Sequence, residues 1–320
     1  MLKALLIILG PTAVGKTEVA LSLLKKIKGE IISADSRQIY KNMDIGTAKP
    51  SKEVREEFPH HLVDIFSPDK IFSAAEFKER AEIIIKSLQK ENKLPIIVGG
   101  SGLYIKVVVD GIFVGPGANW QLREQLKERA RKEGEKSLYQ ELERIDPLAA
   151  SRIHPHDEIR VIRALEVYYL TKKPISSYQK QRLSSLSNTL IIGLRRERAL
   201  LYQLINQRVD KMIKEGLISE VESLLKRGYS ENLFSLQGLG YKHIVKYLRG
   251  DYTKEEAIRL MKRDTRRFAK RQLNYFKQDK RIIWLDMEKY SSPEDVSKEI
   301  IKILSEKLPQ NVVQSFSLTS

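Results

Sequence analysis

The chain has 320 residues, 42% of them hydrophobic, which is enough for about two domains with buried cores. It contains no cysteine, which excludes disulfides, cysteine-ligated zinc and thiol nucleophiles and suits a reducing cytoplasm. The formal net charge is +16, and a surplus of this size favours a polyanionic partner, most often a nucleic acid.

The first motif along the chain is GPTAVGKT, which fits the phosphate-binding pattern G-x-x-x-x-G-K-[ST]. An apolar run of strand length, residues 4–9, precedes it, and residues 18–26 follow with helical spacing. This context lets backbone N–H groups and a helix N-terminus bind phosphate oxygens. We predict that Lys16 reaches a terminal phosphate and that the Thr17 hydroxyl holds Mg²⁺. The predicted phosphate-binding loop is Gly10, Pro11, Thr12, Ala13, Val14, Gly15, Lys16 and Thr17.

Two further predicted strands end in polar residues. Residues 30–34 lead into Asp35, and residues 95–98 lead into Gly-Gly-Ser101-Gly. Ligands of open α/β sheets bind at the carboxyl ends of strands, so we expect Asp35 and Ser101 at the same edge as the loop. Spacing alone gives Asp35 two equally weighted roles, a cap of the following turn and a catalytic base. An ATPase usually has an acidic Mg²⁺ ligand where this chain has Gly-Gly-Ser, which argues against plain nucleotide hydrolysis.

The middle of the chain has a different character. The breaker-rich stretch 111–117 is a candidate domain boundary, residues 117–187 show helical periodicity, and strand character returns at 189–194. We therefore predict an α/β fold, with a P-loop NTPase-like parallel sheet flanked by helices in residues 1–116 and 188–320. Residues 117–187 are predicted to form an all-helical insertion domain. In it, Arg160 and Arg163 share a helix face that either binds a phosphate backbone or is solvated.

Two helices are predicted in the C-terminal part. In 197–225, Arg208 lies near the apolar stripe without an acidic neighbour at helical spacing, so its planar guanidinium is a candidate phosphate ligand. In 254–276, apolar residues including Phe268 and Tyr275 are expected to face inward. The opposite side is nearly all positive and therefore self-repelling without a counter-anion. The polar tail from residue 309 is expected to be frayed.

Several segments together strongly resemble the bacterial tRNA dimethylallyltransferases, or isopentenyl transferases. The matching blocks are GPTAVGKT, SADSRQIY, MDIGTAKP, VGGSGLY, RVIRALEV and FAKRQL, and the likeness runs from residue 4 to about 286. It implies transfer of a dimethylallyl group from its diphosphate to N6 of the adenosine at tRNA position 37, beside the anticodon. Many relatives have threonine where this chain has Ser101, which keeps the hydroxyl. The zinc finger of eukaryotic relatives is absent, since the chain has no cysteine.

The resemblance gives the predicted residues specific roles. Lys16, Arg208 and Mg²⁺ on Thr17 would stabilise the departing diphosphate. Asp35 would take a proton from the adenine amine, and Ser101 would hydrogen-bond the amine or the base. The target adenine must be extruded from the stacked RNA, while the insertion and the basic helix grip the anticodon arm by its backbone. The residues expected to contact tRNA are Asp35, Ser36, Arg37, Gln38, Ser101, Arg123, Arg160, Arg163, Arg263, Arg266, Lys270 and Arg271.

Three alternatives stay open: a transferase that prenylates a free adenine nucleotide, a P-loop small-molecule kinase, and a non-catalytic RNA-binding switch. The insertion and the basic helix argue against the first, since a mononucleotide needs neither. Weak ATP binding also stays open, because P-loops generally accept nucleotides. No apolar run approaches the ~20 residues that span a bilayer, and we see no signal peptide. We expect a cytoplasmic protein with no obligate protein partner.

Overall fold

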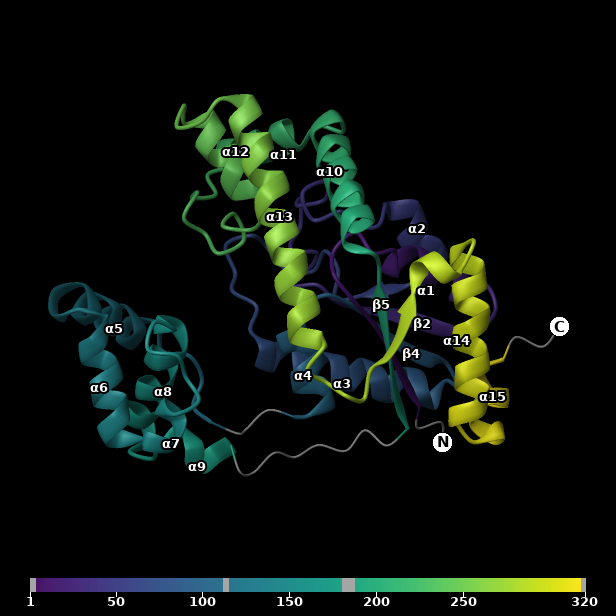
Figure 1. Cartoon of the computed structure of the whole chain (residues 1–320), viewed down its shortest axis with the longest axis horizontal. Coiled ribbons are helices and arrows are strands. Elements are labelled where there is room, and N and C mark those ends of the chain that lie inside the picture. Colours follow the sequence, from purple (N-terminus) through teal and green to yellow (C-terminus); the bar gives the residue numbers. More distant parts are fainter. Residues whose placement is uncertain (1–3, 112–114, 180–187, 318–320) are drawn as a thin grey trace. The chain divides into compact units, whose positions relative to one another are not determined.

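The computed structural model describes residues 4–111, 115–179 and 188–317 (Figure 1). The chain divides into two compact units, Met1–Val109 with Leu186–Ser320, and Asp110–Ser185. The first boundary thus falls at residue 109, whereas the sequence suggested 116. Each unit has its own hydrophobic core.

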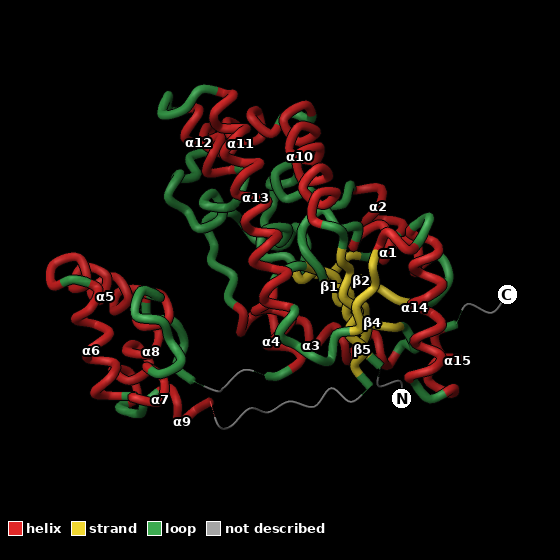
Figure 2. The backbone as a smooth tube through the Cα atoms, in the orientation of Figure 1, coloured by secondary structure: helices red, strands yellow, loops and turns green. Residues whose placement is uncertain are grey.

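The first unit is built on a parallel sheet. Among the described residues its strands follow the order β3-β2-β4-β1-β5-β6 (Figure 2). Strands β1 and β4 are buried along their whole length, as expected for a parallel sheet that is covered on both faces. The strands are β1 (Leu5–Leu9), β2 (Gly29–Ala34), β3 (His60–His61), β4 (Leu94–Gly99), β5 (Thr189–Arg195) and β6 (Ile283–Asp286).

The register aligns the ends of the central strands. Leu9 of β1 lies opposite Gly99 of β4, and Gly99 lies opposite Ala34 of β2. The segments that follow these three strands therefore leave the sheet at one edge. This confirms the predicted P-loop-like α/β core.

Helices surround this sheet. Helix α1 packs against α14, and α13 packs against both α10 and α12. Ser73 and Glu76 form a capping box at the start of α3. The helices of this unit are α1 (Lys16–Leu24), α2 (Lys52–Glu57), α3 (Ala74–Lys90), α4 (Gly102–Val109), α10 (Arg198–Lys214), α11 (Leu217–Lys226), α12 (Tyr241–Leu248), α13 (Lys254–Phe276), the 3₁₀ helix η1 (Met287–Lys289), α14 (Pro293–Lys307) and α15 (Gln310–Phe316).

Two predictions for the C-terminal part are wrong. The tail is not frayed through residue 317, because α15 ends in Phe316, whose side chain is 1% exposed, and the Lys28 N–H donates to the Phe316 carbonyl at 2.7 Å. The inward face of α13 is also rotated from the predicted one. Tyr275 is 39% exposed, whereas its neighbour Phe276 and the polar Gln272 are buried.

The second unit is all-helical in its described residues. Its core contains Leu126, Leu138, Leu142 and Leu165. The helices are α5 (Trp120–Glu133), α6 (Glu135–Ile145), α7 (Pro147–Ala150), α8 (Glu158–Thr171) and α9 (Ile175–Gln179). In neither unit does the described chain contain a helix that is long and apolar enough to cross a membrane.

Candidate active site

The loop between β1 and α1 has the geometry of a phosphate-binding loop. Gly10 approaches β5 so closely that a Cβ there would lie 2.5 Å from the Leu194 carbonyl oxygen. Gly15 precedes α1 with a φ of 107°, in the left-handed region that favours glycine. No side chain caps the N-terminus of α1. Its first N–H groups are therefore open to an anion, where the helix dipole favours negative charge.

Lys16, the first residue of α1, folds back onto this loop. Its Nζ donates to the carbonyl oxygens of Gly10 and Pro11 at 3.0 and 2.7 Å. Burial, followed by repulsion from Arg208, lowers the pKa of Lys16 to about 8, while Asp35 and Glu18 act in the opposite direction. The charged ammonium is therefore held in a poorly solvated place beside a second cation.

That second cation, Arg208, comes from the middle of α10. Its side chain is half-buried and forms no hydrogen bond or ion pair with any described residue. Burial lowers the pKa of Arg208, and the charges of Asp35 and Glu18 partly offset this effect. The fold thus brings Arg208 to the P-loop, near Lys16, and its contact with phosphate stays a prediction.

Asp35 follows β2 at the same edge of the sheet. Its Oδ1 accepts the N–H of Arg37 at 2.8 Å and that of Gln38 at 3.4 Å, so the capping role is present. No described residue donates a hydrogen bond to Oδ2. One oxygen therefore fixes the orientation of the carboxylate, and the other is available to a substrate proton.

Ser101 lies beside Asp35 because β2 and β4 are neighbours. Its N–H donates to the Ala34 carbonyl at 3.1 Å, and its Oγ accepts the N–H of Ser36 at 3.2 Å. The expected hydrogen bond to the base is not formed among the described residues. Ser101 instead holds the turn that carries Asp35.

Gln272 is a site residue that sequence reasoning did not single out. From the buried face of α13, its Oε1 accepts the N–H of Thr12 at 2.9 Å, and its Nε2 donates to the Gly100 carbonyl at 2.9 Å. One amide thus joins the P-loop to the segment after β4. The sequence did contain a signal: Gln272 lies at helical spacing between Ala269 and Phe276, which are both buried.

The Thr17 hydroxyl makes no hydrogen bond with the described residues, so it is available as a metal ligand. Among those residues no group of three or more His, Cys, Asp or Glu is arranged to hold a metal ion. A Mg²⁺ ion at Thr17 would therefore take most of its ligands from phosphate oxygens and water, as Mg²⁺ commonly does at phosphate sites. The donor set fits Mg²⁺ bound together with a diphosphate.

The predicted RNA-contacting segment after Asp35 is held by internal bonds. Gln38 accepts from the Ser33 hydroxyl at 3.0 Å and donates to the carbonyls of Thr47 and Ala48 at 3.3 and 3.1 Å. Arg37 donates to the Ser235 carbonyl at 3.3 Å. The segment is therefore preorganised, and direct contact of its side chains with RNA stays a prediction.

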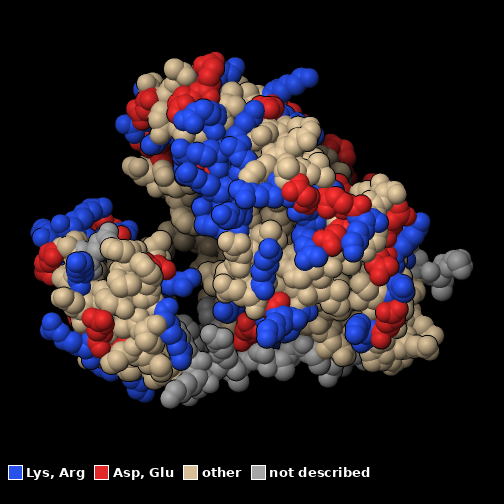
Figure 3. Space-filling view, viewed as in Figure 1, with Lys and Arg blue, Asp and Glu red and all other residues tan. Residues whose placement is uncertain are grey.

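The basic face of α13 forms a strongly positive surface, and Figure 3 shows Lys and Arg side chains gathered over this helix. Part of the charge is neutralised, since Arg263 pairs with Asp264 at 2.8 Å. Arg266 keeps its charge and donates to the neutral Asn206 side chain at 2.6 Å. Lys270 and Arg271 are exposed and form no ion pair with described residues. These two are the best placed of the predicted cations to meet an external anion.

Two arginines of the second unit serve a structural role that the sequence did not indicate. Arg123 and Arg163 both pair with Glu166, whose side chain is fully buried. Burial acts to raise the pKa of Glu166, but hydrogen bonds from the two arginines outweigh it, and the pKa lies below its usual value. Arg160 is exposed and, among the described residues, pairs with Asp157 alone, at 3.3 Å. RNA contact by Arg123 and Arg163 stays a prediction, and their charge is already compensated.

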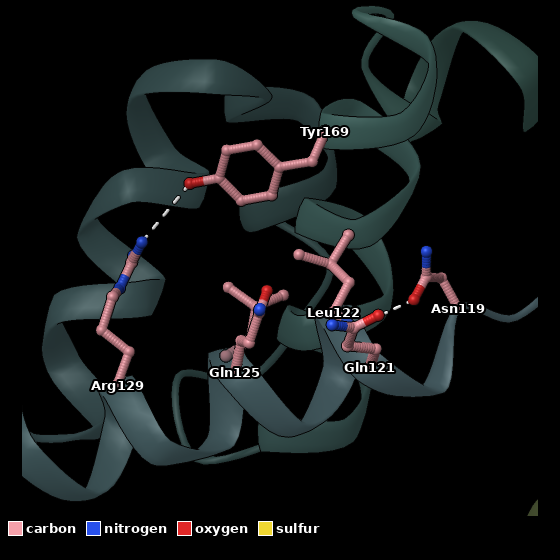
Figure 4. A pocket seen from close by; sticks show the side chains of 7 residues that line it. Asn119, Gln121, Leu122, Gln125, Arg129 and Tyr169 are labelled. Atoms are coloured by element: carbon pink, nitrogen blue, oxygen red, sulfur yellow. Dashed lines mark hydrogen bonds between the residues drawn. The ribbon is translucent and has the colours of Figure 1, made fainter.

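The second unit also has an open hollow of about 520 Å³ between α5 and α8 (Figure 4). Arg129 there donates to the Tyr169 hydroxyl at 3.4 Å and pairs with Glu141. None of the predicted site residues lines this hollow.

Fold and site together define a P-loop α/β protein with two neighbouring cations and a carboxylate at one edge of its sheet. The chain belongs to the IPP transferase family, whose sequence model matches residues 38–279. It is 49% identical over 304 residues to the tRNA dimethylallyltransferase of Alkaliphilus oremlandii, covering 94% of this chain and 97% of the relative.

Two solved structures are also similar. The full-length tRNA isopentenylpyrophosphate transferase of Bacillus halodurans is 41% identical, with a TM-score of 0.69 and coverage of 95% of this chain and 98% of that one. A eukaryotic dimethylallyltransferase acting on tRNA is 26% identical, with a TM-score of 0.81 and coverage of 97% and 83%.

Proposed function

We propose that this chain transfers a dimethylallyl group from dimethylallyl diphosphate to N6 of the adenosine at tRNA position 37, releasing diphosphate. The observation that carries the proposal is the meeting of Lys16, Arg208 and Asp35 at one edge of the sheet. Cations suit the diphosphate, and the carboxylate suits the amine that attacks. Relatives named tRNA dimethylallyltransferase support the choice of reaction.

The donor binds through its diphosphate. The loop N–H groups and the start of α1 receive the phosphate oxygens, and the Lys16 ammonium turns from the loop carbonyls toward them. The Arg208 guanidinium, which has no hydrogen-bond or ion-pair partner in the described part of the chain, forms the second contact. Mg²⁺ held by Thr17 would neutralise further diphosphate charge when bound.

The transfer exchanges two bonds. The bond between the allylic carbon and the diphosphate oxygen breaks, and the bond between that carbon and N6 forms. The amine is a poor nucleophile because its lone pair is delocalised into the ring, so it must lose a proton as the new bond forms. Asp35 Oδ2 accepts that proton, while Oδ1 keeps the carboxylate in place. The departing electrons remain on the diphosphate, beside Lys16 and Arg208.

Recognition of the tRNA anticodon arm relies on charge and base extrusion. The exposed cations of α13 contact phosphates, which makes binding dependent on salt, and the helical unit binds the same arm. The target adenine leaves the stack to reach Asp35. The reaction takes place in the cytoplasm, where a chain without cysteine is suited to reducing conditions, and it requires no protein partner.

The direct test is the mass of tRNA after incubation with the enzyme, dimethylallyl diphosphate and Mg²⁺. We expect the mass to rise by one dimethylallyl group at position 37, with one diphosphate released for each group. AMP offered as the acceptor should remain unmodified, and the γ-phosphate of added ATP should not be consumed. Unchanged tRNA, or prenylated AMP, would contradict the proposal.

A further inference from the structure

Phe234 has a half-exposed aromatic ring next to the proposed site. The residue lies in the loop between α11 and α12, and its side chain is 50% exposed. The guanidinium of Arg37 lies over the ring, 4.1 Å from its centroid. No other ring or cation among the described residues packs against it. The ring is therefore covered on one face by a planar cation and exposed elsewhere.

This pair is held in place before any ligand binds. Arg37 donates to the carbonyl oxygens of Phe234 and Ser235, so the same guanidinium that covers the ring also fixes its backbone. Ser235 is buried, and its hydroxyl donates to the Pro68 carbonyl at 2.7 Å. The loop is thus anchored to the body of the first unit. A surface fixed in advance loses little conformational entropy when a ligand binds.

The pair is also joined directly to the catalytic segment. The backbone N–H of Arg37 donates to Asp35 Oδ1 at 2.8 Å. Arg37 therefore connects the proposed base with the exposed ring. An RNA strand whose adenine reaches Asp35 must pass its neighbouring nucleotides close to this surface.

Resting on the proposed function, we propose that the Phe234–Arg37 pair is a stacking platform for the RNA base next to the extruded adenosine. Extrusion leaves the flanking bases without a stacking partner, and aromatic rings backed by guanidinium planes are surfaces on which unstacked RNA bases pack. The cation on one face of Phe234 leaves the exposed part of the ring for the base. The platform stacks any base, so it supplies affinity and position, with little sequence preference.

Three substitutions separate stacking from simple apolar packing. Phe234→Leu keeps an apolar side chain but removes the ring, Phe234→Trp keeps a ring, and Phe234→Ala removes both. The dissociation constant of an anticodon-stem hairpin should rise about tenfold for the leucine and alanine variants and stay near the wild-type value for the tryptophan variant. Ile83→Ala, at a 62% exposed position of α3, is the matched control and should change nothing. The melting temperature and the KM for the allylic diphosphate report whether each variant is folded.

A fluorescent adenine analogue, whose emission falls when it stacks, locates the contact. Hairpins carry the analogue on one or the other side of the target adenosine. Binding to the wild type should quench it at one of the two positions, and Phe234→Leu should abolish that quenching. The idea is overturned if Phe234→Leu binds like the wild type or if residue 234 affects neither signal. Neither readout requires turnover. If the wild type binds the hairpin and quenches the analogue but does not prenylate tRNA, the proposed reaction is wrong and the stacking platform stands.

Discussion

The guanidinium of Arg208 lies close enough to the ammonium of Lys16 to lower the pKa of that lysine, although the two residues are far apart in the sequence. Neither forms an ion pair with a described residue. Two cations held this way repel each other and lose solvation, so this arrangement costs free energy when no anion is bound. A bound diphosphate removes both costs, so the arrangement is suited to an anion of high charge.

Arg208→Ala should therefore weaken binding of the donor and leave RNA binding intact. We expect the KM for dimethylallyl diphosphate to rise roughly tenfold to a hundredfold, as for loss of a hydrogen bond to a charged group. Arg208→Lys should recover only part of this, because an ammonium lacks the planar fork that matches phosphate oxygens. Steady-state kinetics with each substrate varied in turn measures the effect. If only the KM for tRNA rises, Arg208 belongs to the RNA site.

Donor binding should also depend on pH through Lys16. Burial and then the charge of Arg208 lower the pKa of Lys16 to about 8, so the free enzyme carries this charge below that pH and loses it above. A diphosphate favours the charged form, so binding above pH 8 requires uptake of a proton. The dissociation constant should then rise by up to about tenfold per pH unit.

Calorimetric titration with inorganic diphosphate at several pH values checks this expectation. Lys16→Met is the control, since its pH dependence contains only the ionisation of the ligand and of other groups. The wild type should show the additional loss of affinity in alkaline solution. Identical pH profiles for the two proteins would exclude a role for Lys16 ionisation.

The two oxygens of Asp35 allow its two roles to be separated. Asp35→Asn keeps the acceptor for the N–H of Arg37 but cannot take a proton, so kcat should fall by about 10²–10⁴ while stability is retained. Asp35→Ala should be equally inactive and also less stable by about 1 kcal/mol, because the cap is lost. The affinity for tRNA should stay within a few-fold of the wild type in both variants. Near-normal turnover of the asparagine variant would leave Asp35 with only its capping role.

Local patterns predicted the parts of the site that depend on neighbouring residues. The glycines of the P-loop and the end of β2 at Asp35 follow from residues a few positions apart. The bond of Gln272 to Thr12 does not, because it joins residues that the fold alone brings together. For the same reason the sequence showed the charge of Arg123 but not its buried partner Glu166, which lies 43 positions further along the chain.

The rotation of α13 has a related cause. Aromatic residues are the usual markers of a buried helix face, and Tyr275 suggested the wrong one. The face that packs against the core includes Ala257, Ala269 and Phe276, the residue next to Tyr275. Tyr275 lies over Gly102, where a Cβ would be 2.3 Å from its ring, so the aromatic side chain covers a backbone at the surface.

Stability and donor binding should depend on both the oxygen and the nitrogen of the Gln272 side-chain amide. Gln272→Glu can still accept the Thr12 N–H but places a carboxylate oxygen against the Gly100 carbonyl, whereas Gln272→Ala leaves both backbone groups without a partner. We expect each variant to lose about 1–3 kcal/mol of stability and to show a raised KM for the allylic diphosphate. Denaturant titration and steady-state kinetics measure the two effects. Wild-type donor kinetics in both variants would show that the amide does not position the P-loop.

Replacing basic residues should affect RNA binding in the first unit and stability in the second. Lys270 and Arg271 are exposed and lack ion pairs with described residues, so replacing both with alanine should weaken tRNA binding and leave the melting temperature unchanged. The slope of log K against log salt should become shallower by about one for each cation removed, if both contact phosphates. Arg163→Ala should instead lower stability by about 1–3 kcal/mol, because the buried Glu166 would then have Arg123 as its one ionic partner among the described residues. Filter binding at several salt concentrations and thermal melting distinguish the two classes, and an unchanged salt slope in the Lys270→Ala, Arg271→Ala protein would show that the RNA does not cross this end of α13.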